Sequence, residues 1–183
     1  MAATVILARP SANGFELYMA RRSPRSGFAP DAYVFPGGTV DPQDGAMPVA
    51  LRNAAVRELF EEAGVRLRPD ALTPFSHWIT PPSEPRRYDT HFFFAQAPAD
   101  QIARADAFET HDGIWISPAQ ALERYRNQKL HLVYPTIKHL ERLVAFTSVD
   151  EIADFARTKA IHTICPDDSG DSFEIPAELE NAW

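Results

Sequence analysis

Three carboxylates gather at the end of one predicted helix, and their spacing suits the binding of a divalent cation. Residues 48–63 are rich in strong helix formers, with Pro48 suited to the first turn and Gly64 to the position just past the end. At about 100° per residue, Glu58, Glu61 and Glu62 share one arc about 100° wide. We therefore expect the three carboxylates to point to the same side of the helix.

By itself, this cluster of carboxylates lowers the stability of the helix. Like charges three or four residues apart repel, and the helix C-terminus already carries the negative end of the helix dipole. Mg²⁺ would compensate, because it prefers carboxylate oxygens and also bridges to substrate phosphates. The alternative interpretation is a solvated acidic helix end that binds nothing, and the three glutamates alone do not exclude it.

The rest of the chain has to supply a core that holds this helix. The 183 residues, 45% of them hydrophobic, are enough for one domain over residues 1–183. Residues 3–8, 15–20, 33–35 and 86–95 predict strands, and the first two are joined by a tight turn at residues 11–14. Residues 78–85 are too rich in proline for a central strand.

The second half of the chain predicts three more helices, at residues 118–127, 135–146 and 149–158. Ser117 is the expected N-cap of the first of these helices, and Ser148 is that of the third. Residues 161–165 predict a last strand. The acidic tail at residues 166–183 has no assignment. Strands that alternate with helices indicate an α/β fold, an α/β/α sandwich around a mixed β-sheet.

The composition limits the classes of partner. A net charge of -7 argues against nonspecific binding to nucleic acid or to a membrane surface, so local arginines and metal would have to bind an anionic substrate. The single cysteine, Cys165, excludes an internal disulfide and favours a cytoplasmic location. No apolar run reaches the length needed to span a membrane. The sequence leaves open whether the chain forms a homodimer.

Two groups of arginines are candidates for contacts with phosphate. Arg22 and Arg25 lie in a loop that contains proline and glycine, and such a loop either holds phosphate or is simply solvated. Arg86 and Arg87 are the first residues of the strand predicted at residues 86–95, where a surface ion pair is the alternative. The histidines His111, His131 and His139 have no spacing typical of metal ligands and are expected to be structural or exposed.

Residues 57–65 resemble the second half of the Nudix box, and residues 35–41 resemble the Phe-Pro-Gly-Gly stretch that precedes that box in many members. The first half of the box is absent, since its glycine and glutamate positions hold Gln43 and Val49. Residues 21–38 are also similar to the signature of Nudix enzymes that act on coenzyme A. Residues 85–95 resemble the peroxisomal coenzyme A diphosphatases and their bacterial relatives.

The resemblance implies a Nudix hydrolase with Mg²⁺ or Mn²⁺ held by Glu58, Glu61, Glu62 and the carbonyl of Gly38. It implies that Arg57 orients these carboxylates by ion pairing, and that Glu58 or an acid near the strand end serves as general base. Glu109 is the first candidate for that acid and Asp112 the second.

The implied reaction is hydrolysis of a nucleoside diphosphate linked to another moiety. The preferred substrate is coenzyme A or an acyl derivative, which would give 3',5'-ADP and (acyl-)4'-phosphopantetheine, with Arg22, Arg25, Arg86 and Arg87 as substrate contacts. One alternative is ADP-ribose, NADH or a nucleotide sugar. Another is a noncatalytic Nudix module that senses a nucleotide.

Overall fold

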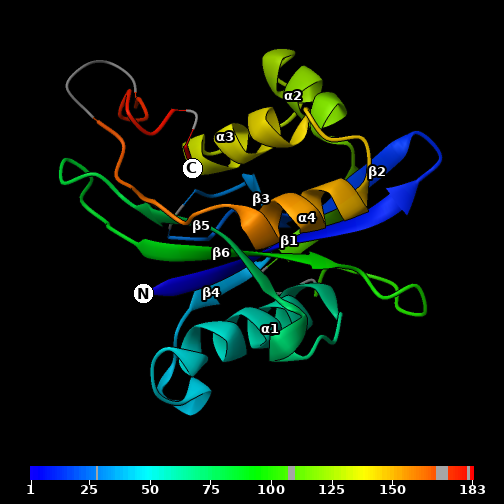
Figure 1. Cartoon of the computed structure of the whole chain (residues 1–183), viewed down its shortest axis with the longest axis horizontal. Helices are drawn as coiled ribbons and strands as arrows, with labels where there is room; N and C mark the ends of the chain where they lie inside the picture. The colour runs from blue at the N-terminus through cyan, green and yellow to red at the C-terminus, as the bar shows by residue number, and fades with distance from the viewer. Residues whose placement is uncertain (28, 107–109, 168–172, 181) are drawn as a thin grey trace.

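A mixed β-sheet lies between two layers of helices (Figure 1). The structure is a computed structural model that describes residues 1–27, 29–106, 110–167, 173–180 and 182–183. Within these residues the strands are β1 (Ala2–Ser11), β2 (Gly14–Arg22), β3 (Tyr33–Val34), β4 (Gly37–Thr39), β5 (Thr73–Ile79), β6 (Asp89–Gln96), β7 (Thr110–Ile116) and β8 (Thr163–Ile164). The helices are α1 (Val49–Ala63), α2 (Pro118–Arg126), α3 (Tyr134–Leu143) and α4 (Val149–Thr158), with short 3-10 helices at Pro42–Asp44 and Pro69–Ala71.

The sheet has two cores, one on each face. Helix α1 lies on one side, and α2, α3 and α4 lie on the other (Figure 1). Because side chains alternate along a strand, Phe93 packs in the core that contains Leu59 of α1, whereas its neighbour Phe94 packs in the core that contains Leu140 of α3. The predicted α/β/α sandwich is confirmed, and so are the three helices after residue 117.

Strand β1 changes its partner halfway along the sheet. Its first residues pair antiparallel with β4, its last residues pair antiparallel with β2, and its other edge pairs in parallel with β6. The strand order is β3-β2-β1-β6-β5-β8, with β4 beside β1 and β7 beside β2. This arrangement places the two glycines of β4 next to α1.

The prediction for residues 78–85 was wrong at its beginning. Trp78 and Ile79 belong to β5, which lies between β6 and β8 in the sheet. Both residues precede Pro81, so their backbone N–H groups are available for the sheet, and only the residues after them leave it. Asp112, the second candidate for the additional acid, lies in β7 and pairs with Arg21 of β2.

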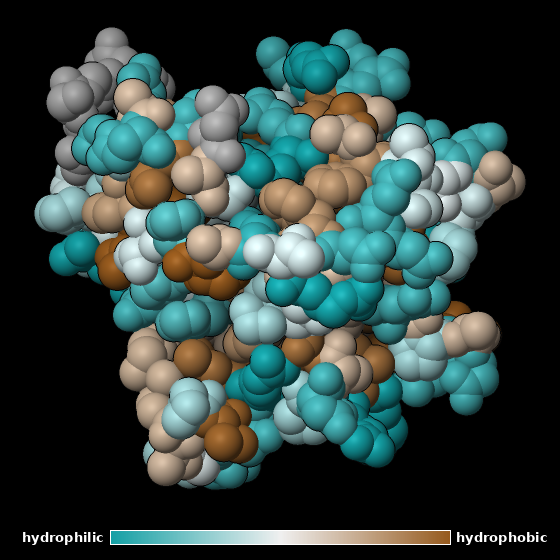
Figure 2. Space-filling model, viewed as in Figure 1, coloured by the Kyte–Doolittle hydropathy of each residue, from teal (hydrophilic) through white to brown (hydrophobic). Residues whose placement is uncertain are grey.

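The chain end is fixed in the core on the α3 side. Trp183 is buried, its ring is 5.1 Å from that of Trp78, and Arg142 of α3 stacks over it. Figure 1 shows the C-terminus beside α3, and Figure 2 shows apolar residues on the same face of the molecule as separate patches among hydrophilic ones. Within the described ranges, no helix is long and apolar enough to cross a membrane.

Candidate active site

Helix α1 ends as its sequence predicts and carries the acidic cluster against β4. Gly64 caps the helix with φ 68°, and its N–H donates to the carbonyl of Phe60 at 2.9 Å. Leu59 and Ala63 are buried against the sheet. The neighbouring side of the last two turns therefore faces the strand that contains Gly37 and Gly38.

The three glutamates of α1 lie in different environments. The backbone N–H of Gly37 donates to Glu62 Oε2 at 2.9 Å, and Glu62 is buried. Glu58 is also buried, and a Cβ on Gly38 would overlap its carboxylate, so only glycine permits this approach. Glu61 is half exposed, with 52% of its side chain accessible. Two carboxylates are thus held by β4, and the third remains open to solvent.

Arg57 joins these carboxylates to the loop before the helix. Its Nη1 donates to Glu58 Oε1 and to Glu61 Oε2, each at 2.9 Å, which are the ion pairs expected from the sequence. Its Nε and Nη2 donate to the two carboxylate oxygens of Asp44, also at 2.9 Å. Asp44 is only 4% exposed, and the backbone N–H of Asp41 donates to it.

Asp44 is the residue that the sequence analysis missed. Val49 stands at the place of the first glutamate of the box, and the carboxylate beside Arg57 comes instead from the 3-10 helix at Pro42–Asp44. The signal that would have found it is local: Asp41, Pro42 and Asp44 have the spacing of a capping box with proline in the first turn. Hydrogen bonds from Arg57 hold the pKa of the Asp44 carboxyl below its ordinary value.

The acidic end of the site fits a divalent cation. Arg57 has a raised pKa, because it is hydrogen bonded to Asp44 first and then to Glu58 and Glu61. It supplies one positive charge to carboxylates that outnumber it, so a net negative charge remains. The donors are carboxylate oxygens, the ligands that Mg²⁺ and Mn²⁺ prefer. Glu58 against Gly38 and Glu62 on the N–H of Gly37 are already fixed in place.

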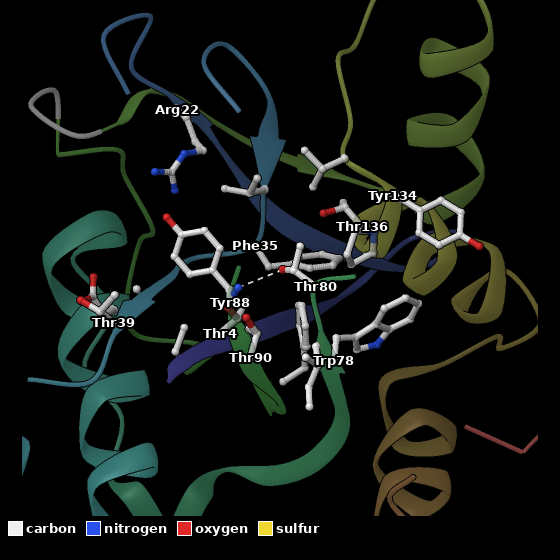
Figure 3. A pocket seen from close by; sticks show the side chains of 18 of the residues that line it. Thr4, Arg22, Phe35, Thr39, Trp78, Thr80, Tyr88, Thr90, Tyr134 and Thr136 are labelled. Carbon is white, nitrogen blue, oxygen red and sulfur yellow. Dashed lines mark hydrogen bonds between the residues drawn. The ribbon is translucent and has the colours of Figure 1, made fainter. Parts of the chain in front are cut away.

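A cavity of about 740 Å³ extends from these carboxylates across the end of the sheet. Its acidic end is lined by Gly38, Asp41, Arg57, Glu58 and Glu61, and its far end by Phe35, Trp78, Leu132, Tyr134 and Phe173. Figure 3 places Thr39 beside α1 and Trp78 and Tyr134 on the opposite side, with Tyr88 and Thr80 between them. The cavity therefore combines a charged end with an aromatic end.

Of the four candidate arginines, only Arg22 is among the described residues that line the cavity. It projects toward Tyr88 in Figure 3, and its guanidinium donates to Ser26 Oγ at 2.7 and 3.1 Å. Arg25 is exposed, Arg86 lies against Gly27, and Arg87 donates from Nε to the carbonyl of Thr80 at 2.9 Å. Arg22 is thus placed to contact a ligand in the cavity, whereas the other three arginines lie outside its lining.

The acids expected from the strand near residues 109–113 are not part of the described cavity lining. Glu109 lies outside the described residues. Asp112 is exposed on β7 and accepts a hydrogen bond from the hydroxyl of Tyr33 at 2.8 Å. His139, expected to be structural or exposed, is fully buried between Ser76 Oγ and the carbonyl of Pro135, and burial lowers its pKa to about 3.

Comparison with known proteins places this geometry in a family. A family model described as NUDIX domain matches residues 1–136. The chain is 27% identical to putative nudix hydrolase 7 of Caenorhabditis elegans, over 90% of this chain and 66% of that protein. It is 26% identical to the acyl-coenzyme A diphosphatase NUDT19 of Gallus gallus, over 80% of this chain and 66% of that protein. The chain thus spans just under two thirds of the length of these curated relatives.

Solved structures give the same assignment of the fold. A NUDIX hydrolase from Alicyclobacillus acidocaldarius aligns with a TM-score of 0.74 and 25% identity, covering 87% of this chain and 96% of that one. The NUDIX domain of Shewanella oneidensis NrtR, solved as a complex with ADP ribose, aligns with a TM-score of 0.62 and 15% identity, covering 79% and 85%. The second likeness concerns the fold alone.

Proposed function

The chain belongs to the Nudix family, and from this premise we propose that it hydrolyses the diphosphate bond of a nucleoside diphosphate linked to another moiety, with coenzyme A or an acyl-coenzyme A as the preferred substrate. The products would be 3',5'-ADP and (acyl-)4'-phosphopantetheine. The observation that carries the proposal is the group of Glu58, Glu61 and Arg57 at one end of a cavity of about 740 Å³, with Glu62 next to it on the N–H of Gly37. That volume lies within the range of cavities that bind small molecules, about 300–1,000 Å³.

The acidic cluster is proposed to hold Mg²⁺ or Mn²⁺. Its ligands would be Glu58, Glu61, Glu62 and the carbonyl oxygen of Gly38, all on α1 and β4. A bound divalent ion neutralises the negative oxygens of the diphosphate and lowers the pKa of a coordinated water. The part of Arg57 is to keep the carboxylates in place, since its Nη1 joins two of them.

The chemical step is the attack of water on one phosphorus of the diphosphate. A new P–O bond forms to the water oxygen, the bond from that phosphorus to the bridging oxygen breaks, and its electron pair stays on the bridging oxygen as part of the second phosphate. The proton that water loses passes to a carboxylate at this end of the cavity, where Glu58 and Glu61 line the wall, and then to solvent. Glu109 stays a candidate for the same role.

The preference for coenzyme A rests on two supports. The chain is similar to acyl-coenzyme A diphosphatases of Gallus gallus and Xenopus laevis, at 26% and 23% identity. The cavity also offers Trp78 and Tyr134 for stacking or apolar contact, and Arg22 for a phosphate. Val133 and Tyr134, at the start of α3, line the same cavity, so the positive end of that helix dipole faces it.

The test is product analysis by mass spectrometry. The purified chain is incubated with coenzyme A, acetyl-coenzyme A, ADP-ribose or NADH, with Mg²⁺ or Mn²⁺ and with chelator, in water enriched in ¹⁸O. The variants are Glu58→Gln and Glu62→Gln, and Glu123→Gln on the exposed face of α2 is the matched control. The label reports which phosphorus the water attacked.

Release of 3',5'-ADP that needs metal, is lost in both site variants and is kept in Glu123→Gln supports the proposal. AMP from ADP-ribose or NADH, without cleavage of coenzyme A, keeps the diphosphatase reaction and refutes the substrate. The NrtR domain was solved with ADP ribose, so this is the first substrate to compare. Tight binding of a nucleotide without turnover would assign a noncatalytic sensing module instead.

A further inference from the structure

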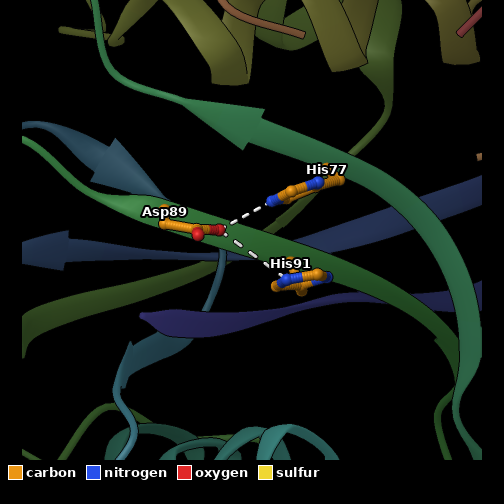
Figure 4. A group of neighbouring side chains, drawn as sticks. All are labelled: His77, Asp89 and His91. Atoms are coloured by element: carbon orange, nitrogen blue, oxygen red, sulfur yellow. Dashed lines mark hydrogen bonds and ion pairs between the residues drawn. The ribbon is translucent and has the colours of Figure 1, made fainter. Parts of the chain in front are cut away.

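A second group of metal-binding side chains lies away from the carboxylates of α1. His77 on β5 and Asp89 and His91 on β6 each offer a ligand atom, and these atoms all lie within 4.8 Å of one another. Among the described residues this is the group of histidines and acids that meets the requirement for one ion. Figure 4 shows the three side chains converging from two neighbouring strands.

Strand register brings the three residues together. His77 is the direct partner of His91, and Asp89 is the partner of Ile79, which is two residues beyond His77. Residues two apart point to the same face of a strand, so all three side chains share one face of the sheet. The two imidazole rings stack with centroids 4.1 Å apart and an angle of 12° between their planes.

The distances bracket the spacing of ligand atoms around a small tetrahedral ion. Asp89 Oδ1 is 2.6 Å from His77 Nε2 and 3.7 Å from His91 Nε2. Ligand bonds of about 2.0–2.2 Å at tetrahedral angles place neighbouring ligand atoms about 3.3 Å apart, which lies between these two distances. Because the lone pair of each ligating nitrogen lies in its ring plane and the two rings are nearly parallel, binding also requires one imidazole to rotate out of the stack. All three residues are partly exposed, so water can reach the fourth position.

A neighbouring hydroxyl group fixes the orientation of one ring. His77 Nδ1 is 2.8 Å from Thr163 Oγ1 of β8. Histidines that bind metal donate their other ring N–H to such a partner, which leaves the lone pair of the ligating nitrogen directed at the ion. In the structure His77 Nε2 is hydrogen bonded to Asp89 Oδ1 at 2.6 Å, so a metal would displace the proton between them; with Nδ1–H donating to Thr163, Nε2 then offers its lone pair to the ion.

The group is distinct from the carboxylates of α1. His91 pairs with Ala3 of β1, and Ala3 pairs with Gly38 of β4, whose backbone lies against Glu58. Two strand spacings, about 10 Å, therefore separate the backbone of His91 from that of Gly38. No carboxylate of α1 belongs to the group of described residues whose ligand atoms lie within 4.8 Å of one another.

We propose that His77, Asp89 and His91 form a separate site for a first-row divalent transition metal, with Zn²⁺ as the best match. Two imidazoles and one carboxylate favour Zn²⁺ or Co²⁺, whereas Mg²⁺ prefers ligand shells of oxygen. The ion ties β5 to β6 just before the loop at residues 80–88, whose Thr80 and Tyr88 line the large cavity. Its main effect is therefore on the stability of that hairpin.

The test measures metal binding directly in the full chain. Protein stripped of metal is titrated with Co²⁺, with d–d absorption as the signal, and then with Zn²⁺ by calorimetry in excess Mg²⁺, which saturates sites made of carboxylates. The variants are His91→Gln, Asp89→Asn and Thr163→Val, and the matched control is His111→Gln, an exposed histidine on β7. Glu58→Gln tests independence from the site on α1, and circular dichroism in chelator shows that each variant is folded.

We expect one equivalent of Zn²⁺ that Mg²⁺ does not displace, a tetrahedral Co²⁺ spectrum and a rise in Tm. His91→Gln and Asp89→Asn lower the affinity by more than about 100-fold, and Thr163→Val lowers it by about 10 to 100-fold, the range for partners outside the ligand shell. His111→Gln and Glu58→Gln leave it unchanged. Equal affinity in the wild type and in either folded ligand variant overturns the proposal and assigns the group as a hydrogen-bonded trio.

Discussion

Replacing Asp44 by asparagine tests whether the carboxylate from the preceding loop anchors Arg57. The substitution keeps the size of the side chain and removes its charge, so the two hydrogen bonds from the guanidinium, each 2.9 Å, lose their anionic acceptor. Hydrogen bonds to charged groups contribute about 1.5–3 kcal/mol, and removing one partner of a buried ion pair costs about 3–5 kcal/mol. Arg57 keeps Glu58 and Glu61, so we expect about 2–3 kcal/mol.

The assay is thermal and urea unfolding of Asp44→Asn beside Asp41→Asn. A loss of about 2–3 kcal/mol corresponds to a decrease in Tm of about 4–12 °C for a chain of this length. Asp41 lies 3.7 Å from the same guanidinium but is 47% exposed, so its substitution costs less than about 1 kcal/mol. Turnover falls in Asp44→Asn as well, because Arg57 no longer holds the two glutamates in one place.

The pH dependence provides a second check. Hydrogen bonds from Arg57 lower the pKa of Asp44 in the folded state below the ordinary value of 3.8, so its contribution to stability is complete above that pH and is lost as the pH falls through the folded pKa. The difference between the wild type and Asp44→Asn therefore shrinks below about pH 4. An Asp44→Asn protein as stable as Asp41→Asn at neutral pH would refute the reasoning.

Three further predictions concern other parts of the molecule. Gly38→Ala places a methyl group on the Glu58 carboxylate, and turnover falls by about 100-fold with little change in circular dichroism; full activity in steady-state kinetics would contradict the assigned contact. Arg22→Lys raises the KM for the nucleotide about tenfold, whereas Arg25→Lys changes it less than about twofold, and equal effects would contradict the placement of Arg22 in the cavity. Burial lowers the pKa of Lys159 to about 7, so unfolding takes up a proton between about pH 7 and the ordinary lysine pKa of 10.5, and folding stability rises across that window. Lys159→Met removes this dependence of the unfolding free energy on pH. If the difference in unfolding free energy between the variant and the wild type does not vary with pH, Lys159 is not neutral in the folded protein.

The features that the sequence determined by itself are local along the chain. Helix α1 was predicted almost to the residue, because the helix-forming residues and the cap at Gly64 act within a few turns. The same is true of the N-cap Ser117, whose hydroxyl accepts the N–H of Gln120. The cluster of Glu58, Glu61 and Glu62 followed from helix geometry, and the family from motifs in which residue types recur at fixed spacing.

Only the tertiary structure decided what meets across long separations. Asp44 reaches Arg57 through a loop that no periodic pattern describes, and Arg22, unlike Arg25, lines the cavity because of where β2 ends. His77 and His91 stack because of the register between β5 and β6, where a shift of one residue would turn one ring to the other face. Helix periodicity and caps depend on neighbours in sequence, whereas strand register and loop closure depend on the packing of the whole core.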